Sequence, residues 1–202
     1  LWWKQNTINL VTALSHRFYS YLITDPNFYT SDQHHFKHVL SKVLSSHKVD
    51  MICFRDKVSH NFDDLAKYFL EICSKFQIEK IFINQKLSVA SKLNATGIHL
   101  TSNQFSEIEI AKSLGLEVII SCHTLEEIRM AQHLGADFAT ISPIFNSPNK
   151  GEPIGIEILN KAKEIATTTK IIALGGIDTN EKLELVKSTD ADGFASIRYF
   201  VN

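Results

Sequence analysis

The stretch Val118–Gly135, VIISCHTLEEIRMAQHLG, contains the structural unit that recurs through this chain. It opens with Val118–Cys122, a short run rich in β-branched residues, as expected of a strand buried on both faces. Thr124 and Glu127 then stand at the spacing of a capping box, which marks the start of a helix. Apolar residues recur at helical spacing up to Gly135, a residue suited to a helix end. The stretch therefore predicts one strand followed by one helix.

The same alternation extends in both directions along the chain. Phe62–Phe76, for example, repeats apolar residues at helical spacing and predicts a second amphipathic helix. Eight strands alternating with helices in 202 residues fit either a closed barrel or a doubly wound sheet, and these patterns leave both open. The other predicted strands are Tyr19–Ile23, Asp50–Phe54, Ile81–Asn84, Gly97–Leu100, Phe138–Ser142, Ile171–Leu174 and Gly193–Ile197.

The ends of the chain depart from simple alternation. Only Arg198–Asn202 follow the last predicted strand, which is too short for a long final helix. We expect residues 1–18 to form an N-terminal helical extension, with Trp2–Leu14 filling the place beside the first strand that a final helix would occupy. Because no low-complexity tract or flexible linker interrupts residues 1–202, we expect a single domain.

Composition narrows the class of protein. The formal net charge of −1 gives no basic footprint for nucleic acid, and no run approaches the roughly 20 apolar residues of a membrane span. Cys53, Cys73 and Cys122 are odd in number and widely spaced, which indicates reduced thiols and a cytoplasmic location. We therefore expect neither nucleic acid nor membrane as a partner; a homo-oligomer stays open.

Polar residues directly follow several predicted strands, and in a parallel barrel these positions meet at one end, where chemistry collects. Gly175 and Gly176 would let backbone amides approach an anion, although ordinary turns use the same pair. Arg55 and Lys57 suit an anion, or else form a surface charge pair with Asp56. The loop 147–151, SPNKG, offers hydroxyl, amide and ammonium groups to a phosphate, or is an exposed turn.

Histidines give further candidates. His123 follows a predicted strand and is suited to general base chemistry, with a structural histidine as the alternative. Its neighbour Cys122 should face the opposite way and be part of the core. His99 is expected to be buried and hydrogen-bonded beneath the site. The cluster His34, His35 and His38 lacks accompanying carboxylates, so we interpret it as a solvated helix face rather than a metal site.

The ordered set of motifs resembles the thiamine phosphate synthase/TenI family from about Tyr19 to Phe200. This resemblance implies a TIM (β/α)8 barrel and decides between barrel and sheet by analogy. The matching segments are Tyr21–Asp25, Phe54–Lys57, Gly97–Leu100, Ser121–Glu127, Gly135–Phe138, Ser142–Lys150, Leu174–Ile177 and Asp192–Ala195.

The resemblance also implies ligands and site residues. The synthase branch joins hydroxymethylpyrimidine diphosphate to thiazole phosphate with the help of Mg²⁺. By similarity, the residues that hold the diphosphate would be Arg55, Lys57, Asn84, Ser121 and Lys150. Those on the thiazole side would be Ser147 and Asn149, with Gly175, Gly176 and Ile177 on the thiazole phosphate.

The chain departs from the synthase pattern at the metal site. Asn84–Lys86 and Thr101–Asn103 stand where that branch has its Mg²⁺-binding aspartates, and neutral amides are poor ligands for a hard cation. We therefore assign no metal ligand. Arg198 replaces a small hydroxyl residue, and would either clamp a phosphate beside the paired glycines or fill the pocket.

The TenI branch lacks those aspartates too. It tautomerises a thiazole carboxylate phosphate with a histidine in the position of His123 and needs no cofactor. However, Lys57 is often lost in TenI-like chains and is retained here. We favour a tautomerase, with His123, Lys57 and Lys150 as the catalytic candidates. The alternatives are a Mg²⁺-dependent synthase and a non-catalytic protein that binds thiamine intermediates.

Overall fold

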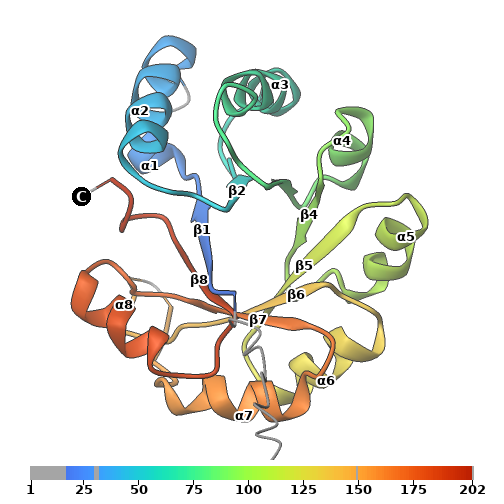
Figure 1. Ribbon diagram of the computed structural model, residues 1–202. Helices are drawn as coiled ribbons and strands as arrows, with labels where there is room; N and C mark the ends of the chain where they lie inside the picture. Colours follow the sequence, from blue (N-terminus) through green and yellow to red (C-terminus); the bar gives the residue numbers. More distant parts are fainter. Residues whose placement is uncertain (1–16, 30–31, 149, 202) are drawn as a thin grey trace, which may run out of the picture.

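The computed structural model describes residues 17–29, 32–148 and 150–201, and its strands form a closed parallel barrel (Figure 1). Each strand pairs with the next in sequence, and β8 pairs with β1. The predicted (β/α)8 barrel is therefore confirmed. The strands are β1 Tyr19–Ile23, β2 Met51–Phe54, β3 Lys80–Asn84, β4 Gly97–Leu100, β5 Glu117–Cys122, β6 Phe138–Ile141, β7 Lys170–Leu174 and β8 Gly193–Ser196.

Helices connect successive strands and surround the barrel, as Figure 1 shows. None of those in the described residues is both long enough and apolar enough to cross a membrane. They are α1 Pro26–Tyr29, α2 Gln33–Ser46, α3 Phe62–Cys73, α4 Leu87–Lys92, the 3₁₀ turn η1 Phe105–Glu107, α5 Ile108–Ser113, α6 Leu125–His133, α7 Glu157–Ile165 and α8 Asn180–Lys187.

The capping box predicted before α6 is present. Thr124 Oγ1 accepts a hydrogen bond from the Glu127 amide at 3.2 Å, and the Glu127 carboxylate accepts one from the Thr124 amide at 3.2 Å. By contrast, α3 ends at Cys73 and not at Phe76, because the Phe76 amide donates to the Cys73 carbonyl in a tighter three-residue turn. The spacing of apolar residues thus continues to Phe76, although the α-helical hydrogen bonds end earlier.

Aromatic side chains fill the barrel interior at the amino ends of the strands. The ring of Phe138 meets Tyr19 edge-on at 5.6 Å and Phe82 at 6.4 Å between centroids. Gly97 makes room for them, since a Cβ atom there would lie 2.7 Å from the Phe82 ring. Gly193 does the same beside Tyr19, where a Cβ would lie 2.9 Å from that residue's own Cβ. The barrel is therefore filled at one end, which leaves the carboxyl ends of the strands for a site.

The chain after β8 forms no further helix in the described residues; its Tyr199 contacts Asn180 of α8 and its Phe200 contacts His47 at the end of α2. Phe200 is buried against Phe194 and His47, with ring centroids 5.7 Å apart in both cases. At the other end, Arg17 and Phe18 lie in no helix. The rest of the predicted N-terminal extension, residues 1–16 with Trp2 and Trp3, lies outside the described residues and stays a prediction.

Candidate active site

A cavity of about 580 Å³ lies at the carboxyl ends of the strands. Its described lining contains four cationic side chains and no carboxylate, so it is suited to an anionic ligand. Every described residue that the sequence predicted for the site lines this cavity, and Asn149 lies outside the described residues. The predicted residues brought together are Arg55, Lys57, Asn84, Ser121, His123, Ser147, Lys150, Gly175, Gly176, Ile177 and Arg198.

Three of the cations come from the loops after β2 and β6. Arg55 forms an ion pair with Asp25 and is thereby held in place. The pKa of the Lys57 ammonium is lowered by burial first, and then by the positive charges of Arg55 and Lys150. Because each of these cations disfavours the charge of the others, a bound anion would relieve their repulsion. Arg55 therefore forms an ion pair with Asp25, which follows β1, whereas the sequence had suggested its neighbour Asp56 as the alternative partner.

The turn after β7 presents backbone amides. Gly175 and Gly176 have φ angles of 100° and 70°, which favour glycine. A Cβ at Gly176 would lie 2.6 Å from the Asn146 carbonyl oxygen, so the neighbouring loop also requires the missing side chain. The amides of residues 175–177 donate to no backbone carbonyl in the described ranges. Amides arranged in this way can bind an oxyanion.

Arg198 lines the same cavity from the end of β8. Its Nη2 lies 3.2 Å from Asp178 Oδ2, and Lys182 Nζ lies 2.7 Å from Asp178 Oδ1. Asp178 belongs to the segment that directly follows the glycine turn. The ion pair therefore holds the guanidinium near the turn, and Arg198 lines the same cavity as the paired glycines.

His123 has its two ring nitrogens in different surroundings. Nδ1 lies 2.9 Å from the Ser142 carbonyl oxygen, which can only accept, so Nδ1 carries the hydrogen. A neutral ring then has a basic Nε2, and His123 lines the cavity. The His123 amide donates to Glu127 Oε2 at 2.5 Å. The capping box thus fixes the backbone of this histidine as well as the start of α6.

The buried His99 lies at the floor of the cavity, which it helps to line. Its Nδ1 is 2.9 Å from the Tyr21 hydroxyl and its Nε2 is 3.1 Å from Ser121 Oγ. Burial and the nearby Arg55 lower the pKa of His99 to about 3. Asn84 Nδ2 donates to the His99 carbonyl at 3.0 Å. The expectation of a buried, hydrogen-bonded histidine is confirmed.

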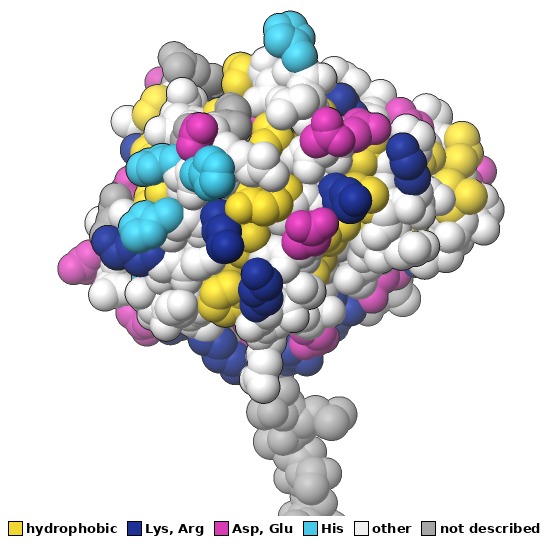
Figure 2. All heavy atoms as spheres, turned by 90° about the horizontal axis from the view of Figure 1, so that it is seen from above, with side chains coloured by type: hydrophobic (Ala, Val, Ile, Leu, Met, Phe, Trp, Pro, Cys, Tyr) yellow, Lys and Arg dark blue, Asp and Glu magenta, His cyan; other side chains and the backbone are white. Residues whose placement is uncertain are grey.

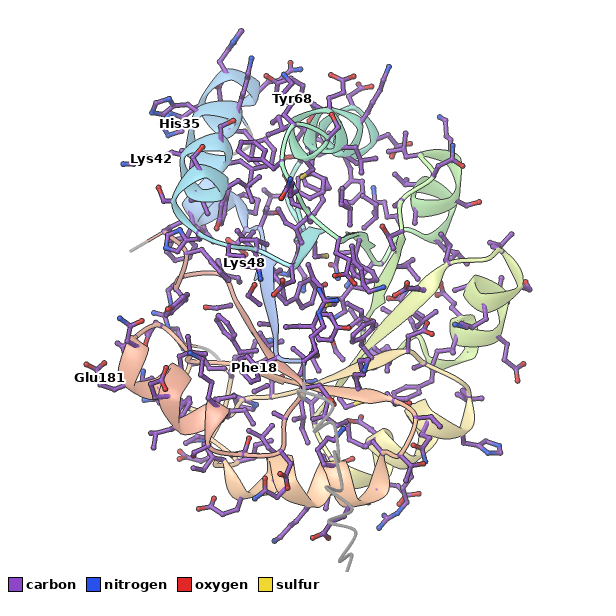
Figure 3. The ribbon with its side chains drawn as sticks, viewed as in Figure 1. Phe18, His35, Lys42, Lys48, Tyr68 and Glu181 are labelled. Atoms are coloured by element: carbon purple, nitrogen blue, oxygen red, sulfur yellow. The ribbon has the colours of Figure 1, made fainter. Side chains whose placement is uncertain are left out.

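Other predictions about single residues are also confirmed. Cys122 is fully buried on the helix side of the sheet, and burial raises the pKa of its thiol. The α2 histidines His34, His35 and His38 are exposed, and His35 points away from the barrel in Figure 3. Figure 2 shows histidine side chains beside lysine and arginine side chains on the face that carries α2.

Phe28 and Tyr21 are among the residues near the site that the sequence did not single out. Phe28 of α1 lines the cavity and is 43% exposed, which is unusual for a large apolar side chain. Its place shortly after a predicted strand was a weak indication. Tyr21 looked like any aromatic residue of a buried strand, and only the fold places its hydroxyl against His99.

Residues 20–200 match the family model described as thiamine monophosphate synthase. The chain belongs to this family. Its motifs and its barrel are therefore those of an enzyme family of thiamine biosynthesis, which confirms the resemblance of the sequence.

Individual relatives agree with the family assignment. The thiamine-phosphate synthase of Clostridium tetani is 32% identical over 183 residues, which cover 88% of this chain and 85% of the relative. That of Syntrophomonas wolfei is 30% identical over 191 residues, with coverage of 88% and 85%. The solved thiamine phosphate pyrophosphorylase of Pyrococcus furiosus superimposes with a TM-score of 0.76 at 24% identity, covering 90% of this chain and 86% of that one. This last likeness concerns the fold.

The synthases of the family generally depend on Mg²⁺, a hard cation that takes oxygen ligands. The residues at the expected place are Asn84, Gln85 and Asn103, which offer neutral oxygens only. In the described part of the chain, no group of three or more histidine, cysteine or acidic side chains is placed so that it could hold a metal ion. Because Mg²⁺ is bound chiefly through carboxylates and phosphates, these residues do not fit it.

Proposed function

We propose that this chain is a tautomerase of a phosphorylated thiazole carboxylate in thiamine biosynthesis, with His123 as the residue that moves the proton. The observation that carries the proposal is the His123 imidazole, whose Nδ1–H is held by the Ser142 carbonyl while the ring lines a cationic cavity. This leaves Nε2 as the base. Histidine is the side chain that most often moves protons in enzymes.

The cavity offers two places for the two anionic groups of such a substrate. The phosphate would bind the amides of Gly175–Ile177, with Arg198 beside them. The carboxylate would face Arg55, Lys57 and Lys150, the second cationic region of the wall. Fixing both ends of a small molecule orients the carbon between them toward the base, which is the main contribution of positioning to catalysis.

The proton transfer needs only groups of the chain and the substrate. His123 Nε2 would take a proton from one carbon of the substrate, the electron pair would shift into the conjugated system, and the resulting imidazolium would return a proton to a second carbon. Substrate and product are isomers, so no further reactant enters. During the step the Ser142 carbonyl would stabilise the imidazolium through Nδ1–H, and nearby cations would stabilise the anionic intermediate.

The test is exchange of substrate hydrogen in D₂O. His123→Asn keeps a donor toward the Ser142 carbonyl but removes the base, so deuterium incorporation should fall at least about a hundredfold. His133→Asn is the matched control, because His133 lies exposed at the end of α6 and outside the cavity. It should exchange like the parent. Equal rates for His123→Asn and the parent would remove His123 from the role of base.

A thiamine phosphate synthase is the second candidate, favoured by the cluster of Arg55, Lys57 and Lys150 on one cavity wall. Three cations suit a departing diphosphate, since stabilising the leaving group is the main task of that reaction. Incubation with both synthase substrates, with and without Mg²⁺, distinguishes the candidates. Formation of thiamine phosphate that responds to Mg²⁺ would overturn the tautomerase proposal in favour of the synthase.

A further inference from the structure

Tyr21, His99 and Ser121 form a chain of hydrogen-bonded side chains, here called the relay, at the floor of the cavity. The hydroxyl of Tyr21 in β1 lies 2.9 Å from Nδ1 of His99 in β4, and Nε2 of His99 lies 3.1 Å from Oγ of Ser121 in β5. Tyr21 is fully buried, whereas His99, which is 3% exposed, and Ser121 both line the cavity. The relay therefore links the barrel interior to the ligand site.

The first hydrogen bond has one favoured direction. Burial raises the pKa of Tyr21 well above its ordinary value, so the hydroxyl keeps its hydrogen and needs an acceptor. The neighbouring groups that can accept are His99 Nδ1 and Cys53 Sγ. Sulfur is a weak acceptor, and an imidazole nitrogen is a strong one. Tyr21 therefore donates to Nδ1, which then carries no hydrogen of its own.

The direction of the second bond follows from the first. With its pKa lowered to about 3, the buried ring is neutral and has one N–H group, which must be on Nε2. Nε2 then donates to Ser121 Oγ. Within the described residues, His99 is the hydrogen-bond partner of that hydroxyl. The Ser121 hydroxyl hydrogen is consequently directed into the cavity.

We propose that His99 is a positioning residue, which together with Tyr21 fixes Ser121 as a hydrogen-bond donor toward an anionic oxygen of the ligand. Arg55 and Lys57 lie on the same cavity, which makes an anionic oxygen the acceptor that fits best. The identity of the ligand rests on the proposed function, whereas the direction of the relay is a property of the free protein. The groups that act on the His99 ring from the surrounding strands are Tyr21, Arg55 and Ser121, while Asn84 binds the His99 carbonyl and Cys53 lies beside Tyr21.

The first test needs no ligand. In protein labelled with ¹⁵N-histidine, long-range proton–nitrogen correlation spectra distinguish the two tautomers, and a His99→Gln variant assigns the signals. We expect the Nε2–H tautomer, with no second proton gained between about pH 8 and about pH 5. An Nδ1–H tautomer, or a doubly protonated ring at about pH 5, would overturn the relay.

The second test measures the action of His99 through Ser121 with inorganic diphosphate as the probe. Ser121→Ala should weaken binding about tenfold, the effect of one charge-assisted hydrogen bond. His99→Met should weaken it too, but the double variant should bind no worse than Ser121→Ala alone, to within about twofold. If the loss of affinity in the double variant equalled the product of the losses in the two single variants, His99 would act independently of Ser121 and the proposal would be refuted.

The two tests separate this inference from the function on which its ligand rests. If the parent bound no diphosphate, the anionic acceptor proposed for the Ser121 hydroxyl would be refuted, while the spectra would still decide the direction of the relay and D₂O exchange would still decide the proposed function. If His99→Met did not fold, the tautomer of the parent would remain the deciding observation. His99→Gln, which keeps an N–H donor, should restore most of the binding that His99→Met loses.

Discussion

The hydroxyl of Thr140 is fully buried in β6 and has no hydrogen-bond partner among the described residues. A buried hydroxyl without a partner costs free energy, so Thr140→Val should leave the free energy of unfolding unchanged or raise it by about 1 kcal/mol. Thr169 is the matched control, because its equally buried hydroxyl donates to the Ala136 carbonyl at 2.8 Å. Thr169→Val should lower stability by about 1 kcal/mol. Urea unfolding of both variants checks the contrast, and equal losses would contradict it.

His99 makes stability depend on pH in the acidic range. Its folded pKa of about 3 lies below the ordinary value, so the unfolded chain binds a proton first as the pH falls. The stability contributed by the neutral ring is fully present above about pH 6.5 and is lost progressively toward pH 3. Between pH 7.5 and pH 5 the loss from this residue should be about 2 kcal/mol. Urea unfolding at the two pH values measures it, and His99→Gln should show a smaller loss.

At the scale of residues, the sequence indicated which residues lie at the site better than it indicated which way their side chains point. His123, Lys57 and Lys150 could be assigned because they follow strands of a parallel barrel, whose ends meet at one rim. The ion pair of Arg198 with Asp178 and the contact of Tyr21 with His99 could not be predicted. They depend on side-chain rotamers and on which way each strand residue faces, and neither is apparent from spacing along the chain.

At the scale of elements, the cap at the start of α6 contributes to the stability of the helix and also positions His123 of the site. Thr124→Ala removes the hydroxyl that accepts from the Glu127 amide and should cost about 1 kcal/mol of unfolding free energy. It should also slow the proton transfer, because His123 directly precedes this cap and its amide binds Glu127. Asp32→Ala removes the cap of α2 away from the cavity and should destabilise to a similar extent while activity is retained. Unfolding curves and D₂O exchange together test the pair; unchanged exchange in Thr124→Ala would contradict it.

The strand and helix pattern was largely predictable, because each strand is a short apolar run between turn residues. Glu117 and Lys170 were placed outside the predicted strands, yet they begin β5 and β7. Both are only partly buried, at the end of the barrel opposite the cavity, so their charged side chains need no apolar surroundings. The end of α3 was missed for another reason, since apolar spacing persists through Phe76 after helical bonding has stopped.

At the scale of the molecule, charge is unevenly distributed. The chain carries a net charge of −1, yet the described lining of the cavity holds four cations and no carboxylate. Binding of inorganic diphosphate should therefore weaken at least about threefold as NaCl rises from about 50 to about 500 mM. Lys150→Gln should flatten this salt dependence, whereas Lys92→Gln, at the exposed end of α4, should not. Calorimetric titration at several salt concentrations measures both; an affinity independent of salt would contradict the anionic ligand.

The turn after β7 has a consequence for any attempt to redesign the enzyme. The carbonyl oxygens of Leu174 and Gly175 accept from the amides of Ile144 and Phe145 at 2.9 and 3.0 Å, so the amide side of the turn, which carries the partial positive charge, is left for the cavity. This polarity is a feature of the main chain. Substitution of side chains around the cavity can change which anionic ligand is preferred. A preference for cationic ligands such as amines would require a different path of the backbone.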